Sequence, residues 1–556
     1  MEEIIRLAIT EVATEYSSQP IEIELSSPDP VFGDYATNIA LKLAKATGQN
    51  PRQLATVLVD SIRQRLDSIL EAVDIAGPGF INLRLNQDSL IKLLNEQPLP
   101  LLEGQIIVFE FSDPNPFKLL HAGHLYTSIV GDSMANLLTQ AGAKVYRVNY
   151  GGDVGLHVAK SLWAMIKELG GEWPDKLQAI DPAQRSQWMS QVYVAGSKAY
   201  ESDETAKIEI TALNKKVYAI QATQDKASSL AKIYWTTRQW SYDAFDKFYA
   251  RLNIGFDKYY PESQATPIGL DTVETQLAAG VFEPSEGAVV FRGEKYGLHT
   301  RVFINSQGLP TYEAKELGLA VLKKNDYNYD QSIIITGNEQ QQYMTVVLKA
   351  LEQFAPGLAL TTTHLTHGMV KLSGGQKMSS RLGNFLTAES IIETTTQAAL
   401  KINDQNDMRV VLAAIKYSML KQRLGGDIIY EPEESVNLIG NSGPYLQYAH
   451  ARARSIISKV NIANLPNDYS LTKDERLLAL KLSRYASVIN LACVELSPHS
   501  VCSYLYELAQ VFNRFYESNR VIGDERESIR LYLVNLYATR LKTGLQLLGI
   551  EAPDRL

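Results

Sequence analysis

Two histidines at the start of a predicted helix carry the first chemical signal in the sequence. His121 and His124 follow a proline-containing turn at residues 112–117, and apolar residues then recur at three- and four-residue steps over residues 125–140. Side chains three apart at a helix start lie on one face, and the free amides of the first turn attract anions. Two imidazoles in this place suit a triphosphate whose α-phosphoryl group is being attacked.

Gly123 lies between the two histidines. Because glycine has no side chain, we expect a flat base to approach the backbone closely there. A bare His-x-Gly-His pattern is weak evidence, since two ordinary histidines at a helix start give the same pattern. Its position after a strand and before a helix favours a nucleotide site.

The elements around this turn are typical of half of a nucleotide-binding parallel sheet. Residues 105–111 are β-branched and apolar, residues 144–149 read as the next strand, and residues 332–337 read as a fully buried strand. A strand, a turn, a helix and a strand in this order predict such a fold. Residues 160–253 form long amphipathic helices, which we interpret as an insertion between the two halves of the sheet.

The whole chain predicts three domains of an α/β protein. Residues 1–97 read as a small α/β module with a tight turn at residues 32–38. Residues 98–425 form the Rossmann-like domain with its helical insertion, and residues 426–556 form an all-α bundle. A chain of 556 residues is too long for a single core, which agrees with this division.

Composition limits the class of protein further. The chain has 54 basic and 62 acidic residues, a net charge of −8, which argues against loose coating of nucleic acid but leaves room for local basic patches. Two cysteines exclude a disulfide framework and a cysteine-rich zinc site. The N-terminus does not read as a signal peptide and no apolar run reads as a membrane span. We therefore expect a cytoplasmic protein without a membrane partner.

Several segments together resemble one enzyme family. Residues 111–124, Phe-Ser-Asp-Pro-Asn-Pro-Phe-Lys-Leu-Leu-His-Ala-Gly-His, and residues 377–381, Lys-Met-Ser-Ser-Arg, resemble the two ATP motifs of class I aminoacyl-tRNA synthetases. The Gly-Asp-Val-Gly turn at residues 152–155 and the Tyr-Leu-Gln-Tyr-Ala-His-Ala-Arg helix from residue 445 point to the arginyl-tRNA synthetases within that class. The closing Leu-Leu-Gly-Ile-Glu-Ala-Pro-Asp-Arg does so as well, so the resemblance covers nearly the whole chain.

The resemblance implies a fold, a reaction and its partners. It implies a class I Rossmann-like sheet, an N-terminal domain that binds the tRNA elbow and a helical domain that binds the anticodon. The reaction would activate L-arginine with ATP, with Mg²⁺ on the phosphates and no zinc, and would transfer the arginyl group to the 3′ end of tRNA(Arg). Activation in this family generally needs bound tRNA, and its members are usually monomers.

Site residues follow from the same resemblance. Clustered positive charge favours attack of a carboxylate on a phosphoryl group. Family members often lack the second lysine of the Lys-Met-Ser-Lys-Ser loop, and Ser380 occupies that position here. In such members the lysine before the first histidine is expected to compensate, and Lys118 stands there. The expected catalytic residues are His121, His124, Lys118 and Lys377, and the expected ATP contacts are Gly123, Gly368, Met369, Ser379 and Arg381.

The amino-acid pocket should hold a planar cation. A guanidinium group favours paired carboxylates and an aromatic face. Glu316 is one methylene longer than the aspartate usual in the family. By resemblance, Glu262, Tyr312 and Glu316 match guanidinium-binding positions, and Glu110, Ser112, Asn115 and Gln340 complete the arginine site.

The outer domains gain candidate tRNA contacts in the same way. Aromatic and arginine side chains suit unstacked anticodon bases, although tyrosines of a helical bundle also serve as core. The candidates are Phe32, Tyr35 and Asn38 in the N-terminal domain and Tyr445, Tyr448, Arg452 and Arg454 in the bundle.

Three other functions remain open at this point. A synthetase for another amino acid is disfavoured because it has no need for two acids facing a cation. A non-catalytic tRNA-binding paralogue is disfavoured because the histidines and Lys377 are intact. A nucleotidyltransferase that shares only the His-x-Gly-His turn is disfavoured by the long helical C-terminus.

Overall fold

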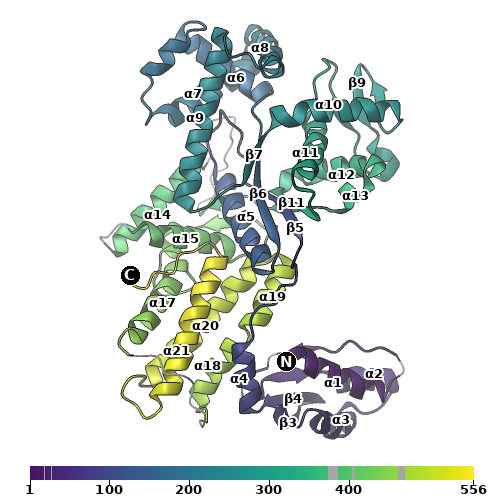
Figure 1. Cartoon of the computed structure of the whole chain (residues 1–556), viewed down its shortest axis with the longest axis vertical. Helices are drawn as coiled ribbons and strands as arrows, with labels where there is room; N and C mark the ends of the chain where they lie inside the picture. Colours follow the sequence, from purple (N-terminus) through teal and green to yellow (C-terminus); the bar gives the residue numbers. More distant parts are fainter. Residues whose placement is uncertain (18, 27, 30, 374–385, 404–406, 461–469) are drawn as a thin grey trace.

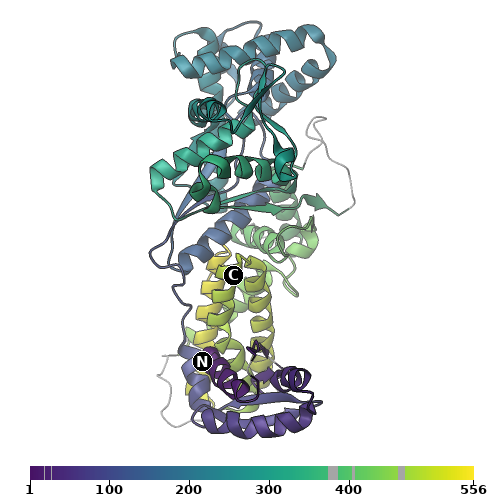
Figure 2. The ribbon, with the colours of Figure 1, turned by 90° about the vertical axis from the view of Figure 1, so that its right-hand side faces the viewer.

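The computed structural model describes the chain except for residues 18, 27, 30, 374–385, 404–406 and 461–469. The molecule is elongated (Figures 1 and 2), with a parallel sheet in its middle part. A helical insertion lies at one end, and the N-terminal domain and a C-terminal helical bundle lie side by side at the other.

The central sheet has the parallel topology that the sequence predicts. Its strand order is β12-β11-β5-β6-β7, and every neighbouring pair is parallel. The order changes direction on either side of β5, which places a ligand crevice at the carboxyl end of that strand. The strands are β5 (Ile106–Glu110), β6 (Lys144–Gly151), β7 (Lys258–Pro261), β11 (Gln331–Gly337) and β12 (Thr362–His367).

Two insertions interrupt the sheet. The first, between β6 and β7, is helical as predicted and consists of α6 (Leu156–Leu169), η1 (Pro174–Ala179), α7 (Arg185–Ser202), α8 (Glu204–Thr223) and α9 (Ser229–Leu252). The second, between β7 and β11, holds a three-stranded antiparallel sheet flanked by two helices. It consists of α10 (Glu262–Ala278), β8 (Glu283–Ser285), β9 (Ala288–Phe291), η2 (Gly293–Tyr296), β10 (Arg301–Ile304) and α11 (Tyr312–Tyr327). The helices η3 (Asn338–Gln340), α12 (Gln341–Phe354) and α13 (Pro356–Leu360) then lead from β11 to β12.

The N-terminal domain is a four-stranded antiparallel sheet covered by helices. The predicted tight turn at residues 32–38 is partly wrong, because Tyr35–Thr37 form strand β2, which pairs with a strand on either side. The strand is only three residues long and contains the small residue Ala36, so its sequence was read as part of a turn. The elements are α1 (Glu2–Thr14), β1 (Leu25–Ser26), β2 (Tyr35–Thr37), α2 (Ile39–Thr47), α3 (Pro51–Arg65), β3 (Leu70–Ala76), β4 (Phe80–Leu85) and α4 (Gln87–Asn95).

The C-terminal part is mostly helical. Residues 473–495 are long and apolar enough to cross a membrane by length and composition alone, a candidate that sequence analysis did not identify. Half of its most apolar 18-residue window is buried in the protein, and the stretch divides at Arg484 into two helices of the bundle. The elements are β13 (Val370–Leu372), α14 (Ala388–Ile402), α15 (Met408–Leu420), β14 (Ile428–Tyr430), α16 (Pro432–Ser435), α17 (Gly443–Ile457), α18 (Lys473–Ser483), α19 (Tyr485–Glu495), α20 (Pro498–Ser518) and α21 (Glu527–Leu547).

Helix α5 (Ala122–Gln140) belongs to both the sheet and the bundle. It begins at the carboxyl end of β5 and crosses to β6. Near its other end, Ser133 Oγ donates to Leu547 O at 3.0 Å, and Cys493 Sγ lies 3.1 Å from Leu137 O. One continuous apolar core therefore runs from the sheet into the bundle.

The N-terminal domain docks on the bundle through a buried carboxylate. Asp34, 4% exposed, accepts hydrogen bonds from Leu85 N and from Arg476 Nη2, both at 2.7 Å. The guanidinium of Arg484 lies 4.1 Å from the ring centre of Tyr35. The two arginines of α18 and its C-cap thus join the domains through one acid and one aromatic ring.

We expect Arg476→Met to lower the free energy of unfolding by about 3 kcal/mol, because it leaves the carboxylate of Asp34 buried without its cation. Calorimetric melting of the intact protein measures this. Lys481→Met on the same helix is the matched control, since the Lys481–Glu507 pair is more exposed and such pairs contribute about 1 kcal/mol or less. Equal destabilisation of the two variants would contradict the expectation.

Candidate active site

One cavity of about 680 Å³ lies at the carboxyl ends of β5, β6 and β11. The structure brings together there most of the residues predicted from the sequence. Lys377, Ser379 and Arg381 lie outside the described residues, and Lys118 lies beside the cavity rather than in its lining. The predicted residues in the lining are Glu110, Ser112, Asn115, His121, Gly123, His124, Glu262, Tyr312, Glu316, Gln340, Gly368 and Met369.

The two histidines cap helix α5 with their own rings. His121 Nδ1 accepts from Gly123 N at 3.1 Å and from His124 N at 3.4 Å, and His124 Nδ1 accepts from His121 N at 3.2 Å. The rings are stacked, with their centres 3.7 Å apart. Because each Nδ1 accepts a hydrogen bond, the proton of each neutral ring lies on Nε2. The pair therefore offers two N–H donors to a ligand.

Both histidines are neutral near pH 7, which differs from the positive charge expected of them. Burial, together with Lys118, lowers the pKa of His121 to about 4. Burial and the neighbouring His121 lower the pKa of His124 well below its ordinary value. In the absence of a bound anion, both rings are therefore neutral hydrogen-bond donors.

Gly123 is also required by the ring of His121. A Cβ at this position would lie 2.8 Å from Cε1 and 2.9 Å from Nδ1 of His121. The missing side chain leaves room for this capping ring, and the approach of a flat base to Gly123 stays a prediction.

The turn between β5 and α5 is held in an uncommon backbone conformation. Ser112, Asp113 and Phe117 have φ values of 78°, 49° and 70°, a region that non-glycine residues rarely adopt. Tertiary hydrogen bonds hold them there: Asp113 Oδ1 accepts from Tyr150 N at 2.8 Å, and Ser112 Oγ lies 2.8 Å from Tyr249 OH. The surrounding structure thus fixes the turn before a ligand binds.

The inner end of the cavity is lined by acids, and two of these acids form ion pairs with buried lysines. Lys323 Nζ donates to Glu110 Oε2 at 2.6 Å, and Lys315 Nζ donates to Glu262 Oε2 at 2.7 Å. All four side chains are at most 4% exposed. Burial would lower the pKa of Lys315, but Glu262 outweighs it and raises that pKa. Glu262 is therefore not a free partner for a substrate cation.

Glu316 has no such cation among the described residues. Its Oε1 accepts a hydrogen bond from Tyr343 OH at 2.8 Å. Burial and the like charge of Glu110 raise the pKa of Glu316 to about 8. The hydroxyl of Tyr150, buried in the same wall, has no hydrogen-bond partner within the described chain. A cation entering the cavity could therefore approach an acid that has no ion-pair partner in the described chain and a hydroxyl that has no hydrogen-bond partner there.

Lys118, the expected compensating lysine, lies at the border with the helical insertion. Its Nζ is 5.1 Å from the ring centre of Tyr193 on α7, a cation–π distance. Its charge also contributes to the lowered pKa of both histidines.

Comparison with known proteins identifies the chain's family. The family described as "tRNA synthetases class I (R), catalytic domain" matches residues 89–431. "Arginyl tRNA synthetase N terminal domain" matches residues 1–85, and "DALR anticodon binding domain" matches residues 446–556. The chain belongs to the class I arginyl-tRNA synthetases.

Individual relatives agree with this family. The arginine–tRNA ligase of Porphyromonas gingivalis is 27% identical over 594 residues, which cover 99% of this chain and 98% of that protein. The structure of Thermus thermophilus arginyl-tRNA synthetase has a TM-score of 0.82, 25% identity and full coverage of both chains. A methionyl-tRNA synthetase of Mycobacterium tuberculosis, with 13% identity, a TM-score of 0.52 and 83% and 92% of the two chains covered, shares the fold alone.

The expected tRNA contacts of this synthetase occupy different environments in the N-terminal domain. Phe32 is 56% exposed, whereas Tyr35 is 3% exposed and covered by Arg484. The amide of Asn38 donates to Glu24 at 2.7 Å. Of the three, Phe32 is the side chain that an RNA base can reach without rearrangement.

Two of the four expected contacts in the bundle, Tyr448 and Arg452, belong to one exposed aromatic group. Tyr448 is 46% exposed, and the guanidinium of Arg452 lies 5.3 Å from its ring and 5.7 Å from the ring of Tyr516. Tyr445 accepts a hydrogen bond from Asn513 at 2.8 Å, and Arg454 pairs with Asp554 at 3.2 Å.

Sequence analysis missed Lys315, Lys323, Tyr150 and Tyr343. Lys315 and Lys323 are buried on α11, the helix that carries Tyr312 and Glu316. Lysine is rarely buried without a partner acid. A lysine on the core-facing side of this helix could therefore have indicated a buried ion pair. Tyr150 and Tyr343 gave no pattern of their own.

We expect Gly123→Ala to reduce the rate of amino-acid activation by about a hundredfold, because the new Cβ displaces the ring of His121 by roughly 1 Å. Pyrophosphate exchange measures the rate, and the melting temperature should change little. Gly255→Ala, where a Cβ has no atom within 4 Å, is the matched control. Similar rates in both variants would show that the histidine cap does not depend on Gly123.

Proposed function

We propose that the chain activates L-arginine with ATP and then transfers the arginyl group to the 3′ end of tRNA(Arg). The observation that carries the proposal is that the two ends of one cavity carry different kinds of polar group. Neutral imidazole donors at a helix start lie in its lining, and its inner wall carries Glu316, an acid without a lysine partner in the described chain. The first group suits a polyphosphate, and the second suits a guanidinium.

The amino-acid end of the cavity can hold arginine by charge and by hydrogen bonds. The guanidinium would approach Glu316 and the free hydroxyl of Tyr150, with the remaining Glu262 oxygen beside them and the ring of Tyr312 at the wall. Lys315 pairs with Glu262, so this pair adds no net charge to the site. A neutral side chain would leave Glu316 protonated and would form no ion pair with it, so it would bind less tightly than a cation.

The nucleotide end would place ATP on the histidine cap. The first-turn amides of α5 and the Nε2–H groups of His121 and His124 suit negatively charged oxygens. The arginine carboxylate attacks the α-phosphorus, and the bond from that phosphorus to the bridging oxygen breaks. Pyrophosphate then leaves with the electron pair.

Positive charge for the departing pyrophosphate would come from Lys118 and from the segment that holds Lys377 and Arg381, which is outside the described residues. Mg²⁺ would enter with ATP, bound by its phosphates, because no trio of histidine, cysteine or acidic side chains in the described part of the chain forms a metal site. The ion would neutralise phosphate charge there.

We further propose which residues contact tRNA. The exposed ring of Phe32 and the Tyr448–Arg452 group would contact the elbow and the anticodon. Activation is proposed to require bound tRNA, and the enzyme is proposed to act as a cytoplasmic monomer.

Pyrophosphate exchange tests the proposed reaction directly. We expect arginine alone among the amino acids to support exchange, and only when tRNA(Arg) is present. Lysine and citrulline, tested at the same concentration, are the matched controls for charge and shape. Stimulation by another amino acid, or no exchange under any of these conditions, would refute the proposed function.

The affinity for arginine should rise with pH. In the empty cavity Glu316 has a pKa of about 8 and is mostly protonated at neutral pH. A bound cation favours its ionised form, so binding releases a proton, and the Kd should fall about 25-fold between pH 6.5 and 8.5.

Titration calorimetry in two buffers with different ionisation enthalpies measures both the Kd and the proton release. Glu316→Gln should weaken arginine binding by about 2 kcal/mol or more and remove the pH dependence, while leaving ATP affinity unchanged. If the variant kept the same pH slope, another group would be the one that titrates.

A further inference from the structure

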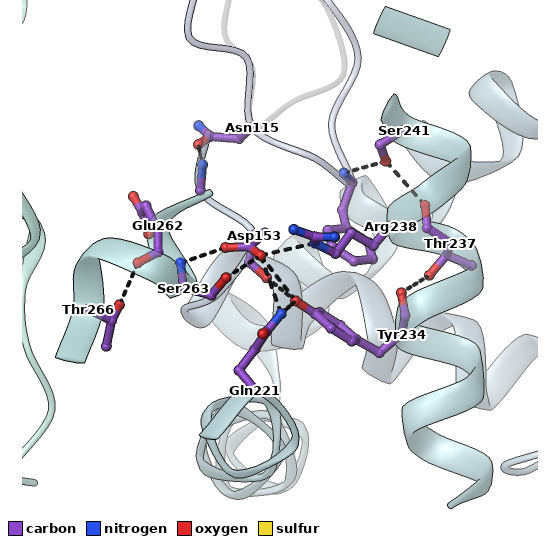
Figure 3. Close-up of polar contacts among 12 residues, drawn as sticks. Asn115, Asp153, Gln221, Tyr234, Thr237, Arg238, Ser241, Glu262, Ser263 and Thr266 are labelled. Carbon is purple, nitrogen blue, oxygen red and sulfur yellow. Dashed lines mark hydrogen bonds and ion pairs between the residues drawn. The ribbon is translucent and has the colours of Figure 1, made fainter. Parts of the chain in front are cut away.

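Next to the amino-acid pocket, the carboxylate of Asp153 joins its own turn to three helices, α8, α9 and α10. It lies in the turn between β6 and α6 and is fully buried. Figure 3 shows that it faces the first turn of α10 on one side and helices of the helical insertion on the other. Glu262, Ser263 and Arg238 surround it in this view.

On the side of α10, Asp153 acts as an N-cap from another part of the chain. The helix begins at Glu262 after Pro261, which provides no side-chain cap. Asp153 Oδ1 accepts from Ser263 N at 2.9 Å, and Oδ2 accepts from Ser263 Oγ at 2.7 Å. A carboxylate at a helix start satisfies a free amide and favours the helix dipole.

On the other side, two helices of the insertion hold the same carboxylate. Arg238 Nε on α9 donates to Asp153 Oδ2 at 2.9 Å, and Gln221 Nε2 on α8 donates to it at 3.3 Å. Tyr234 OH donates to the carbonyl oxygen of Asp153 at 3.0 Å. Arg238 is 18% exposed and Asp153 is not exposed, so this ion pair is largely shielded from solvent.

The turn that carries Asp153 also contacts two pocket residues. Gly152 N donates to Asn115 Oδ1 at 2.8 Å. A Cβ on Gly152 would lie 2.5 Å from Asn115 Oδ1 and 3.1 Å from Glu262 Oε1, so backbone and both side chains are in close contact. A shift of Asp153 therefore moves Asn115 through Gly152 and moves Glu262 through Ser263.

We propose that Arg238, acting through Asp153, is a positioning residue that sets Glu262 and Asn115, so that the helical insertion controls the affinity of the site for its amino acid. The inference rests on the proposed function of the cavity. Arg238 touches no substrate in this proposal. Its effect is confined to the amino-acid end, because the histidine cap is held by its own hydrogen bonds on α5.

Steady-state pyrophosphate exchange with bound tRNA tests the proposal. Arg238→Gln should raise the KM for arginine about tenfold, as expected for a displacement of less than 1 Å, and should change the KM for ATP by less than about twofold. Asp153→Asn should have a similar effect. The double variant should be no worse than the worse single variant, because both act through one ion pair.

The matched control is Arg185→Gln. Arg185 lies on α7 of the same insertion, 4.3 Å from the ring centre of Trp240, and does not contact Asp153. Its KM for arginine should stay unchanged. Ser263→Ala removes a single hydroxyl and keeps the test decisive should Arg238→Gln fold poorly; we expect it to raise the KM for arginine about threefold at an unchanged melting temperature.

Each result has a clear consequence. A KM for arginine in Arg238→Gln and Ser263→Ala equal to that of Arg185→Gln would overturn the inference, and so would a parallel rise in the KM values for arginine and ATP. Absence of arginine-dependent exchange in the unsubstituted protein would instead refute the proposed function, so the two failures are distinguishable.

Discussion

Several buried carboxyl groups share one cavity, and the rest of the site is arranged around the need to balance them. A buried charge is tolerated only when it is paired or when its proton remains bound. Lys323 and Lys315 neutralise Glu110 and Glu262, and burial raises the pKa of Asp113 well above its ordinary value. Glu316 has no lysine partner among the described residues, and burial raises its pKa to about 8. A bound cation would therefore favour loss of the Glu316 proton.

The two ends of the cavity are prepared in different ways. At the helix start the histidines are fixed by backbone hydrogen bonds and remain neutral, which avoids repulsion between two stacked imidazolium rings. At the inner end, tyrosine hydroxyls and lysines orient the carboxylates. In both cases the donors and acceptors are in place before the substrates arrive, which reduces the reorganisation needed during the reaction.

The fold was largely predictable from the sequence, because strand and helix periodicity and the order of motifs agree over most of the chain. The lining of the cavity was predictable where a motif names the residue, as with His121 and Glu262, and their roles stay predictions. The ionic partners were not, because Lys315 and Glu262 are 53 positions apart and meet only through the packing of α10 against α11. No local pattern records that contact.

Errors of prediction arose where one local pattern fits two structures. The segment around Tyr35 has the glycine and aspartate of a turn, yet part of it is a central strand whose tyrosine is buried at a domain junction. Residues 473–495 have the composition of one long apolar helix, but the chain divides there at Arg484 into α18 and α19, and the side chain of Arg484 lies against Tyr35 of the N-terminal domain. Tertiary contacts are present in both cases.

Helix α5 has one further consequence for the enzyme. His121 and His124 lie at its start, and Ser133, about 17 Å further along the helix, donates to Leu547 O in the last turn of α21 in the anticodon-binding domain. One helix therefore joins the cavity proposed for ATP to the domain that resembles an anticodon-binding domain. Any coupling between the two binding sites must be reciprocal: if bound RNA raises the affinity for ATP by some factor, bound ATP raises the affinity for RNA by the same factor.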